Sequence, residues 1–71
     1  MIKLQKDLVK DDIIQVGYGE EDNLVTVIVD EVINHEGTNS SYSSEIKGRF
    51  LVDDSKVSMW GNPNSQVVVI E

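Results

Sequence analysis

Apolar and polar residues alternate along most of this chain, with the period of two that a β-strand with one buried face requires. In the stretch EIKGRFLVD, Ile46, Phe50 and Val52 share one parity, and the other parity is mainly charged. We predict a half-buried strand here, with Leu51 as an apolar exception. Gly48 falls between two inward residues, where a missing side chain suits a sharp bend or a bulge.

The stretch NLVTVIVDEVI shows the same alternation and then loses it. Val25, Val27 and Val29 form the expected inward face. Asp30 and Glu31 then interrupt the pattern before two further aliphatic residues follow. We predict a β-bulge near Asp30, because one extra residue would reset the phase of the alternation.

Shorter segments complete the pattern, and residues that favour turns separate them. We expect strands in MIKLQ, DIIQVGY, KVSMW and QVVVI, with turns in GYGEEDN, VDDSK and WGNPNS. KDLVKDD is the one segment in which a helical turn could form, with Asp7 as its cap.

The choice of apolar residues favours β-structure throughout. The chain has eleven Val, seven Ile and four Leu, and it has no Ala. β-Branched residues pack well on a pleated surface and are poorer helix formers. We therefore expect an all-β fold with a single domain over residues 1–71: a small barrel or rolled sheet of five or six short antiparallel strands. An SH3-like barrel is the first choice, and an OB-like or Sm-like barrel is the second.

A polar loop at 34–44 interrupts the strands. No aliphatic side chain occurs from Asn34 to Ser44, so we expect a solvated and mobile hairpin extension. Tyr42 stands alone among Ser and Asn, a composition similar to that of adaptable binding loops. We consider Tyr42 a candidate contact with a protein partner. Alternatively, its ring folds back over the mouth of the barrel.

The charge is strongly negative and unevenly distributed. The net charge is −7, and residues 11–46 contain nine acidic side chains and no Lys or Arg. This acidic region is expected to repel duplex DNA and anionic membranes and to attract a basic protein partner. It could also mimic a phosphate backbone and block a basic groove. The simpler interpretation is that carboxylates at turns and strand ends maintain solubility.

The residue inventory argues against an enzyme and predicts no catalytic, cofactor or metal site. The chain lacks Cys, and His35, its one imidazole, lies in the polar loop, a poor place to hold a catalytic base. EEDN and DDS lack the spacing of a calcium loop. Absence of Cys and of long apolar runs favours a cytoplasmic protein, and the initial Met1 suggests an intact chain.

A single-stranded nucleic-acid-binding barrel is the first alternative. Such barrels combine basic side chains with aromatic rings on which bases stack. Lys47 and Arg49 are expected on the outer face of one strand, and Trp60 is expected to point outward from the next strand. That patch is small for this class of binding site.

The closing segment SQVVVIE has an unusual pattern, because both of its faces are apolar. Val67 and Val69 would share one face, and Val68 and Ile70 would share the other. Water should not cover both faces, so either another chain or the turn at Asp7 to Val9 covers the second one.

These patterns together favour a non-enzymatic protein-interaction or assembly module, with an accessory or inhibitory role as one form of it. A homo-oligomer is one expected form of the assembly. Trp60 and Leu51 offer further apolar area as a candidate extension of the second face of the closing strand. The predicted partner-binding residues are Tyr42, Leu51, Trp60, Val68 and Ile70.

Overall fold

The structure is a computed structural model that describes residues 1–18, 23–35 and 43–70. These residues form six strands and one short 3-10 helix, and they contain no α-helix. In chain order the elements are β1 (Ile2–Leu4), η1 (Gln5–Asp7), β2 (Ile13–Tyr18), β3 (Asn23–Asn34), β4 (Ser44–Phe50), β5 (Lys56–Gly61) and β6 (Gln66–Ile70). The all-β prediction is confirmed, and each of the six expected segments contains a strand.

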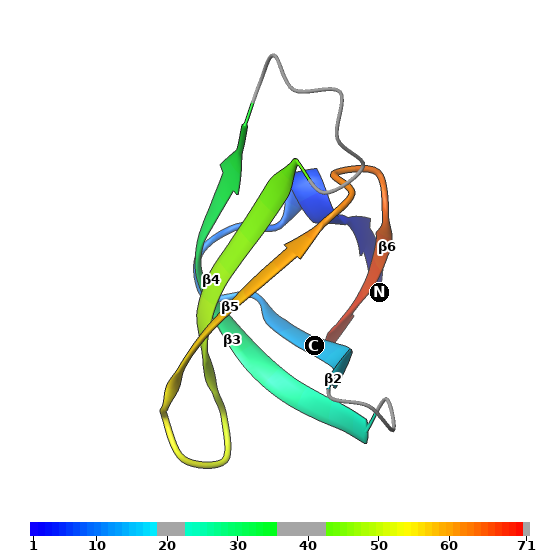
Figure 1. Cartoon of the computed structure of the whole chain (residues 1–71). Coiled ribbons are helices and arrows are strands. Elements are labelled where there is room, and N and C mark those ends of the chain that lie inside the picture. Colours follow the sequence, from blue (N-terminus) through cyan, green and yellow to red (C-terminus); the bar gives the residue numbers. More distant parts are fainter. Residues whose placement is uncertain (19–22, 36–42, 71) are drawn as a thin grey trace.

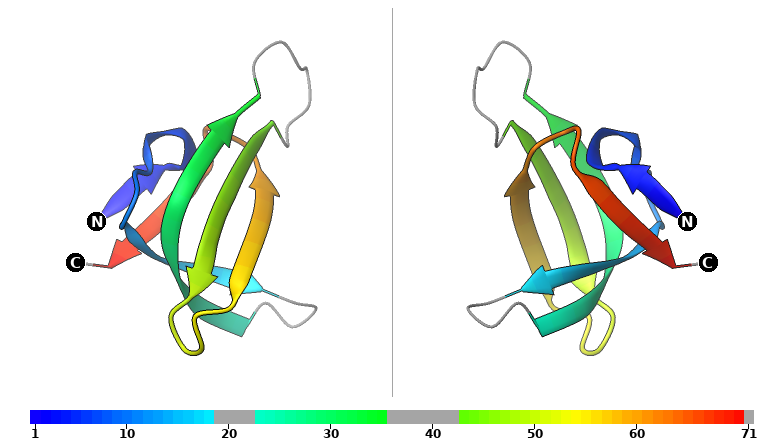
Figure 2. Two further views of the ribbon diagram at one scale, coloured as in Figure 1. Left: turned by 90° about the vertical axis from the view of Figure 1, so that its left-hand side faces the viewer. Right: turned by 90° about the vertical axis from the view of Figure 1, so that its right-hand side faces the viewer.

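The six strands belong to one antiparallel sheet with the order β1-β6-β2-β3-β4-β5. Strands β2 to β5 follow one another as a meander, and the last strand returns to lie between β1 and β2. The sheet is strongly curved (Figures 1 and 2). Its end strands, β1 and β5, do not pair with each other, so the sheet is not closed.

The predicted bulge lies where the alternation fails. The β3–β4 register shifts between Val29 and Glu31, which leaves Asp30 as the extra residue. Gly48 on β4 lies opposite Val29. A side chain at Gly48 would collide with the backbone carbonyl of Ile28 and come within 2.9 Å of Cγ1 of Val27. The glycine therefore permits close approach of β3 and β4 beside the bulge.

The core lies on the concave face of the sheet and consists almost wholly of β-branched side chains. This follows from the alternation, because inward positions two apart along each strand meet the same positions of neighbouring strands. Its buried members are Leu8, Ile14, Val27, Val29, Ile46, Val57, Val67 and Val69. Val25, Phe50 and Met59 are half-buried against this cluster.

Three details differ from the sequence-based expectations. β4 ends at Phe50, so Val52 lies in the following turn and is 90% exposed instead of facing inward. The helical turn ends at Asp7, and Leu4 occupies its N-cap position without a side-chain cap, so Asp7 is not a cap. The β3–β4 ladder continues to the pair Asn34 and Ser44, so the predicted loop at 34–44 begins and ends inside strands.

Gln5 in η1 joins the two ends of the open sheet. Its amide Nε2 donates to the backbone carbonyl of Ser44 over 3.1 Å, and its backbone N–H donates to the Ser65 carbonyl over 2.8 Å. The side chain is buried against Gly61, where an added Cβ would lie 2.7 Å from the Gln5 Oε1 atom. One polar side chain thus connects the β1–β6 side of the molecule to the β4–β5 hairpin.

No helix in the described part of the chain is long and apolar enough to span a membrane.

Candidate functional site

The outer face of β6 retains exposed aliphatic side chains, as the two-sided pattern predicted. Val67 and Val69 are buried, whereas Val68 and Ile70 are 46% and 40% exposed. Ile2 of β1 lies directly opposite Val68 and is 62% exposed. These three side chains, Ile2, Val68 and Ile70, form what we call the β6 apolar surface.

The turn at Asp7 to Val9 does not bury this surface. Leu8 from the turn enters the core instead and is 5% exposed. Val9 points to solvent and is 58% exposed. An ion pair holds the turn in place, because the Lys3 ammonium lies 3.1 Å from Oδ2 of Asp12, which also accepts the Val9 N–H over 3.0 Å. This hydrogen bond from Val9, followed by the bond from Lys3, lowers the pKa of Asp12.

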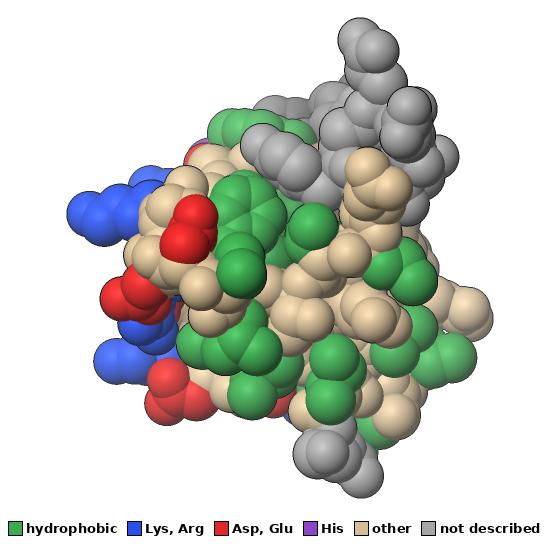
Figure 3. Space-filling view, turned by 90° about the horizontal axis from the view of Figure 1, so that it is seen from below, with side chains coloured by type: hydrophobic (Ala, Val, Ile, Leu, Met, Phe, Trp, Pro, Cys, Tyr) green, Lys and Arg blue, Asp and Glu red, His purple; other side chains and the backbone are tan. Residues whose placement is uncertain are grey.

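Leu51 belongs to a second apolar region, which lies at the turn after β4 and the adjoining part of β3. It is 54% exposed and lines a hollow of about 290 Å³ together with Leu24, Val25, Thr26, Phe50 and Val52. Figure 3 views the molecule from below, and apolar side chains are spread over that end. Gln15 of β2 and Thr26 of β3 lie between Val68 and Leu51 in the strand register, so two polar side chains separate Leu51 from Val68.

Trp60 points outward from β5, as predicted, and is 53% exposed. The His35 imidazole stacks on its indole with ring centroids 4.9 Å apart and 22° between the ring planes. His35 Nε2 also lies 3.7 Å from Oε1 of Glu45, whose Oε2 accepts the Ser58 hydroxyl over 2.6 Å. One face of the indole is therefore already occupied by a side chain of this chain, which leaves the other face for a stacking or cationic group.

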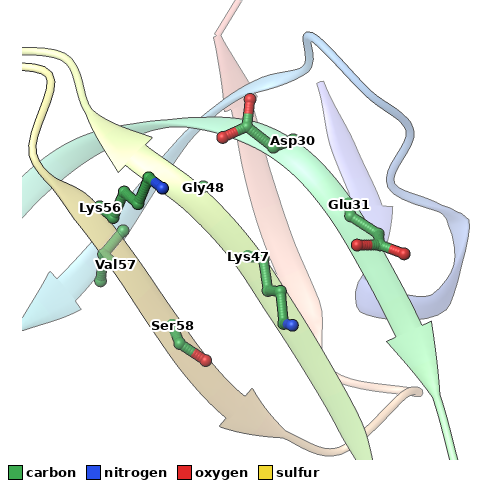
Figure 4. A pocket seen from close by; sticks show the side chains of 7 residues that line it. All are labelled: Asp30, Glu31, Lys47, Gly48, Lys56, Val57 and Ser58. Carbon is green, nitrogen blue, oxygen red and sulfur yellow. The ribbon is translucent and has the colours of Figure 1, made fainter.

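A charged groove of about 430 Å³ runs over the outer face of β3, β4 and β5. Figure 4 shows Asp30 and Glu31 on β3 at one side, with Lys56 and Ser58 on β5 at the other. The remaining lining residues are Lys47, Gly48 and Val57. Side chains of both signs line the groove, so its walls favour no simple anion or cation.

Arg49 is engaged by two carboxylates beside this groove. Its Nε donates to both oxygens of Asp30 at 3.2 Å, and its Nη1 donates to Asp54 Oδ1 at 2.9 Å. The hydrogen bond to Asp30 and the nearby negative charges raise the pKa of Arg49. In the turn, the hydroxyl and the N–H of Ser55 both donate to Asp53 and lower the pKa of that carboxyl. The basic patch considered for nucleic-acid binding is thus largely paired internally at Arg49.

The four predicted partner-binding residues that the structure describes do not form one surface. Val68 and Ile70 lie together, Trp60 lies on β5, and Leu51 lies beyond the far end of β4. Tyr42 lies outside the described residues. Gln5, which joins the two sides of the molecule, was not predicted, because a single Gln after a three-residue strand carries no pattern that a sequence can reveal.

The described residues contain no group of three His, Asp or Glu side chains arranged to hold a metal ion. Comparison of the chain with protein families, curated proteins and solved structures finds no match.

Proposed function

We propose that this protein is a non-enzymatic binding module that holds a protein partner against its β6 apolar surface, on a partly open SH3-like barrel. The observation that carries the proposal is the exposure of Ile2, Val68 and Ile70 side by side on a strand whose other face is buried. A solvated outer face of an antiparallel sheet normally carries polar residues. Aliphatic residues there favour burial by another chain.

Burial of the β6 apolar surface would supply a modest part of the binding energy. Full burial of a Val or Ile side chain contributes about 1.5–3 kcal/mol. Val68 and Ile70 are 46% and 40% exposed, so covering the rest of each contributes about 1 kcal/mol by the same measure. The net charge of −7 favours a partner with an apolar centre and basic residues around it, because opposite charges accelerate association.

Paired substitutions test this proposal. Val68→Thr with Ile70→Thr keeps strand-forming residues on β6 while adding polar groups to the surface. The matched control is Leu51→Thr with Val52→Thr, which alters the same number of exposed apolar residues in the turn after β4. Immobilised wild-type and variant proteins are compared for capture of partners from the native host at low and high salt. Each captured partner is then purified for affinity measurement.

We expect the Val68→Thr and Ile70→Thr double variant to lower the affinity for a captured partner at least about tenfold, or about 1.4 kcal/mol. The control double variant should leave the affinity unchanged. Equal affinity for both double variants would contradict the proposal. Capture that nuclease treatment abolishes would favour the single-stranded nucleic-acid module. Loss of capture at high salt with no effect of the β6 pair would favour an acidic mimic.

A further inference from the structure

The outer edge of β5 is open in the described structure. β5 ends the strand order, and no described strand pairs with its far side. In both views of Figure 2, β5 lies at a margin of the sheet. An unpaired edge presents backbone N–H and C=O groups that can pair with another strand.

The hydrogen bonds show which residues of β5 face this edge. The Phe50 N–H donates to the Ser55 carbonyl over 2.9 Å, and this pair continues the β4–β5 register. In an antiparallel pair, hydrogen-bonded and non-hydrogen-bonded residue pairs alternate along the strands. Val57 and Met59 therefore direct their backbone groups toward β4. The backbone N–H and C=O groups of the alternate residues Lys56, Ser58 and Trp60 point to the open edge.

The two edges of the sheet differ in how well they are protected. β1 has three residues and runs directly into η1, so it offers little edge to another strand. β5 has six residues, pairs with β4 without a register shift, and contains no proline. Its inward residues carry no charge. Among the devices that a strand itself can carry against edge pairing, β5 has one lysine at its beginning.

We propose that two copies of this chain form a dimer by antiparallel pairing of their β5 edges, with the two-fold axis at Ser58. In this register Ser58 lies opposite its own equivalent, and Lys56 lies opposite Trp60 of the second copy. Each of these is a hydrogen-bonded pair, so all three outward residues are used and about six inter-chain hydrogen bonds form. Moving the axis to Val57 or Met59 leaves one outward residue without a partner in β5.

Side-chain chemistry favours the same register. Lys56 and Trp60 lie on the outer face, so each Lys56 ammonium can rest on the exposed indole of the other copy. Glu45 lies opposite Trp60 in the β4–β5 register, so its carboxylate is on the same face of the sheet as that indole. On the inner face, Val57 meets Met59 of the second copy, which joins the two cores. The strand is thus complementary to itself in this register.

The dimer is independent of the proposed binding function, because it uses β5 and leaves Ile2, Val68 and Ile70 uncovered. The oligomeric state is measured by light scattering at about 100 µM, well above the micromolar range of ordinary specific association. Wild type is expected at twice the mass of one chain, and so is Val68→Thr with Ile70→Thr. Dimerisation lost only in that β6 double variant would overturn the β5 proposal and leave the β6 surface as the self-association site.

Ser58→Pro tests the edge directly. The Ser58 N–H points away from β4, so proline removes a donor of the dimer and none of the β4–β5 ladder. We expect a folded monomer, with at least about a hundredfold weaker association. Ser58→Ala is the matched control, because it loses the hydroxyl bond to Glu45 but keeps the N–H, and it should remain dimeric. Equal association of the proline and alanine variants would overturn the proposal.

Cysteine cross-linking tests the register and does not depend on the proline variant folding. The chain contains no Cys, so each introduced thiol is unique. Opposed Cα atoms of a hydrogen-bonded pair lie about 5.5 Å apart, which is within the range for a disulfide. Ser58→Cys should therefore form a disulfide-linked dimer on mild oxidation. Lys56→Cys should not, because its equivalents lie about 13 Å apart along the strands. Cross-linking that is equally fast at both positions, or a wild type that is monomeric at about 100 µM, would refute the dimer.

Discussion

The two halves of the sheet, β3–β4–β5 on one side and β1–β6 on the other, are stabilised in different ways. On the β3–β4–β5 side the ladders are long, with seven registered pairs between β3 and β4, and the outer face carries Lys47 and the ion pair of Arg49 with Asp30. On the β1–β6 side only three registered pairs join the strands, and the outer face is aliphatic. Short ladders supply few backbone hydrogen bonds, so side-chain burial must contribute more there. The side with the fewest registered pairs is therefore also the side on which aliphatic side chains remain exposed.

The largest expected effect on stability is at Gly48, where β4 lies close against β3. Gly48→Ala would drive a Cβ into the Ile28 carbonyl, which cannot move without shifting β3. We expect a loss of about 3 kcal/mol in the free energy of unfolding, the upper part of the usual range for overpacking. Urea denaturation measures this loss. Gly61→Ala is the control and should cost clearly less, because it meets the movable end of the Gln5 side chain. Equal losses would show that the β3–β4 approach is not specially tight.

Gln5→Met tests the hydrogen bond that links the β1–β6 side to the β4–β5 hairpin. Methionine fills a similar volume but cannot donate to the buried Ser44 carbonyl. We expect a loss of about 1–2 kcal/mol, because a buried acceptor is left without its partner. Gln15→Met makes the same chemical change at an exposed position of β2 and should be nearly neutral in chemical denaturation. A neutral Gln5→Met variant would mean that the bond from Gln5 to Ser44 adds nothing to the contacts that already hold the two sides together.

Acid should weaken the β1–β6 side through Asp12. Its pKa in the folded protein lies below the ordinary value of 3.8, so its stabilising effect is present above pH of about 3.8 and is lost as pH falls through the folded pKa. Asp12→Asn should therefore flatten the decline of stability with pH in that window, as followed by denaturation midpoints. Asp53 also has a lowered pKa, and Asp53→Asn should flatten the decline less because that turn is exposed. An unchanged slope in Asp12→Asn would argue against the contacts with Val9 and Lys3.

The smallest expected effect is on the surface of the charged side. Arg49→Lys keeps the charge, but a single ammonium cannot reproduce the contacts of the guanidinium with Asp30 and Asp54. We expect a slight loss of stability that is visible at low salt and disappears at high salt, because exposed ion pairs are screened. Denaturation at two salt concentrations measures it. A loss that persists at high salt would indicate a packing role for the Arg49 stem instead.

Much of the fold could be predicted because strand faces repeat every two residues. Alternation, β-branched composition and the flanking turn residues predicted the segments of all six strands. Parity predicted the outward direction of Trp60 and Leu51 and the bulge at Asp30. Val52 was placed wrongly inward because the parity pattern continues for two residues after the strand ends. A local pattern cannot reveal that the turn VDDSK already begins at Leu51.

The sequence by itself determined which side chains face inward and which face outward, since alternation is a property of each strand alone. Only the tertiary structure decided which strands become neighbours. It placed β6 between β1 and β2 and brought the Gln5 amide to the Ser44 carbonyl. It also revealed the carbonyl that makes Gly48 necessary. These contacts join residues that are distant in the chain, so the parity of one strand carries no record of them.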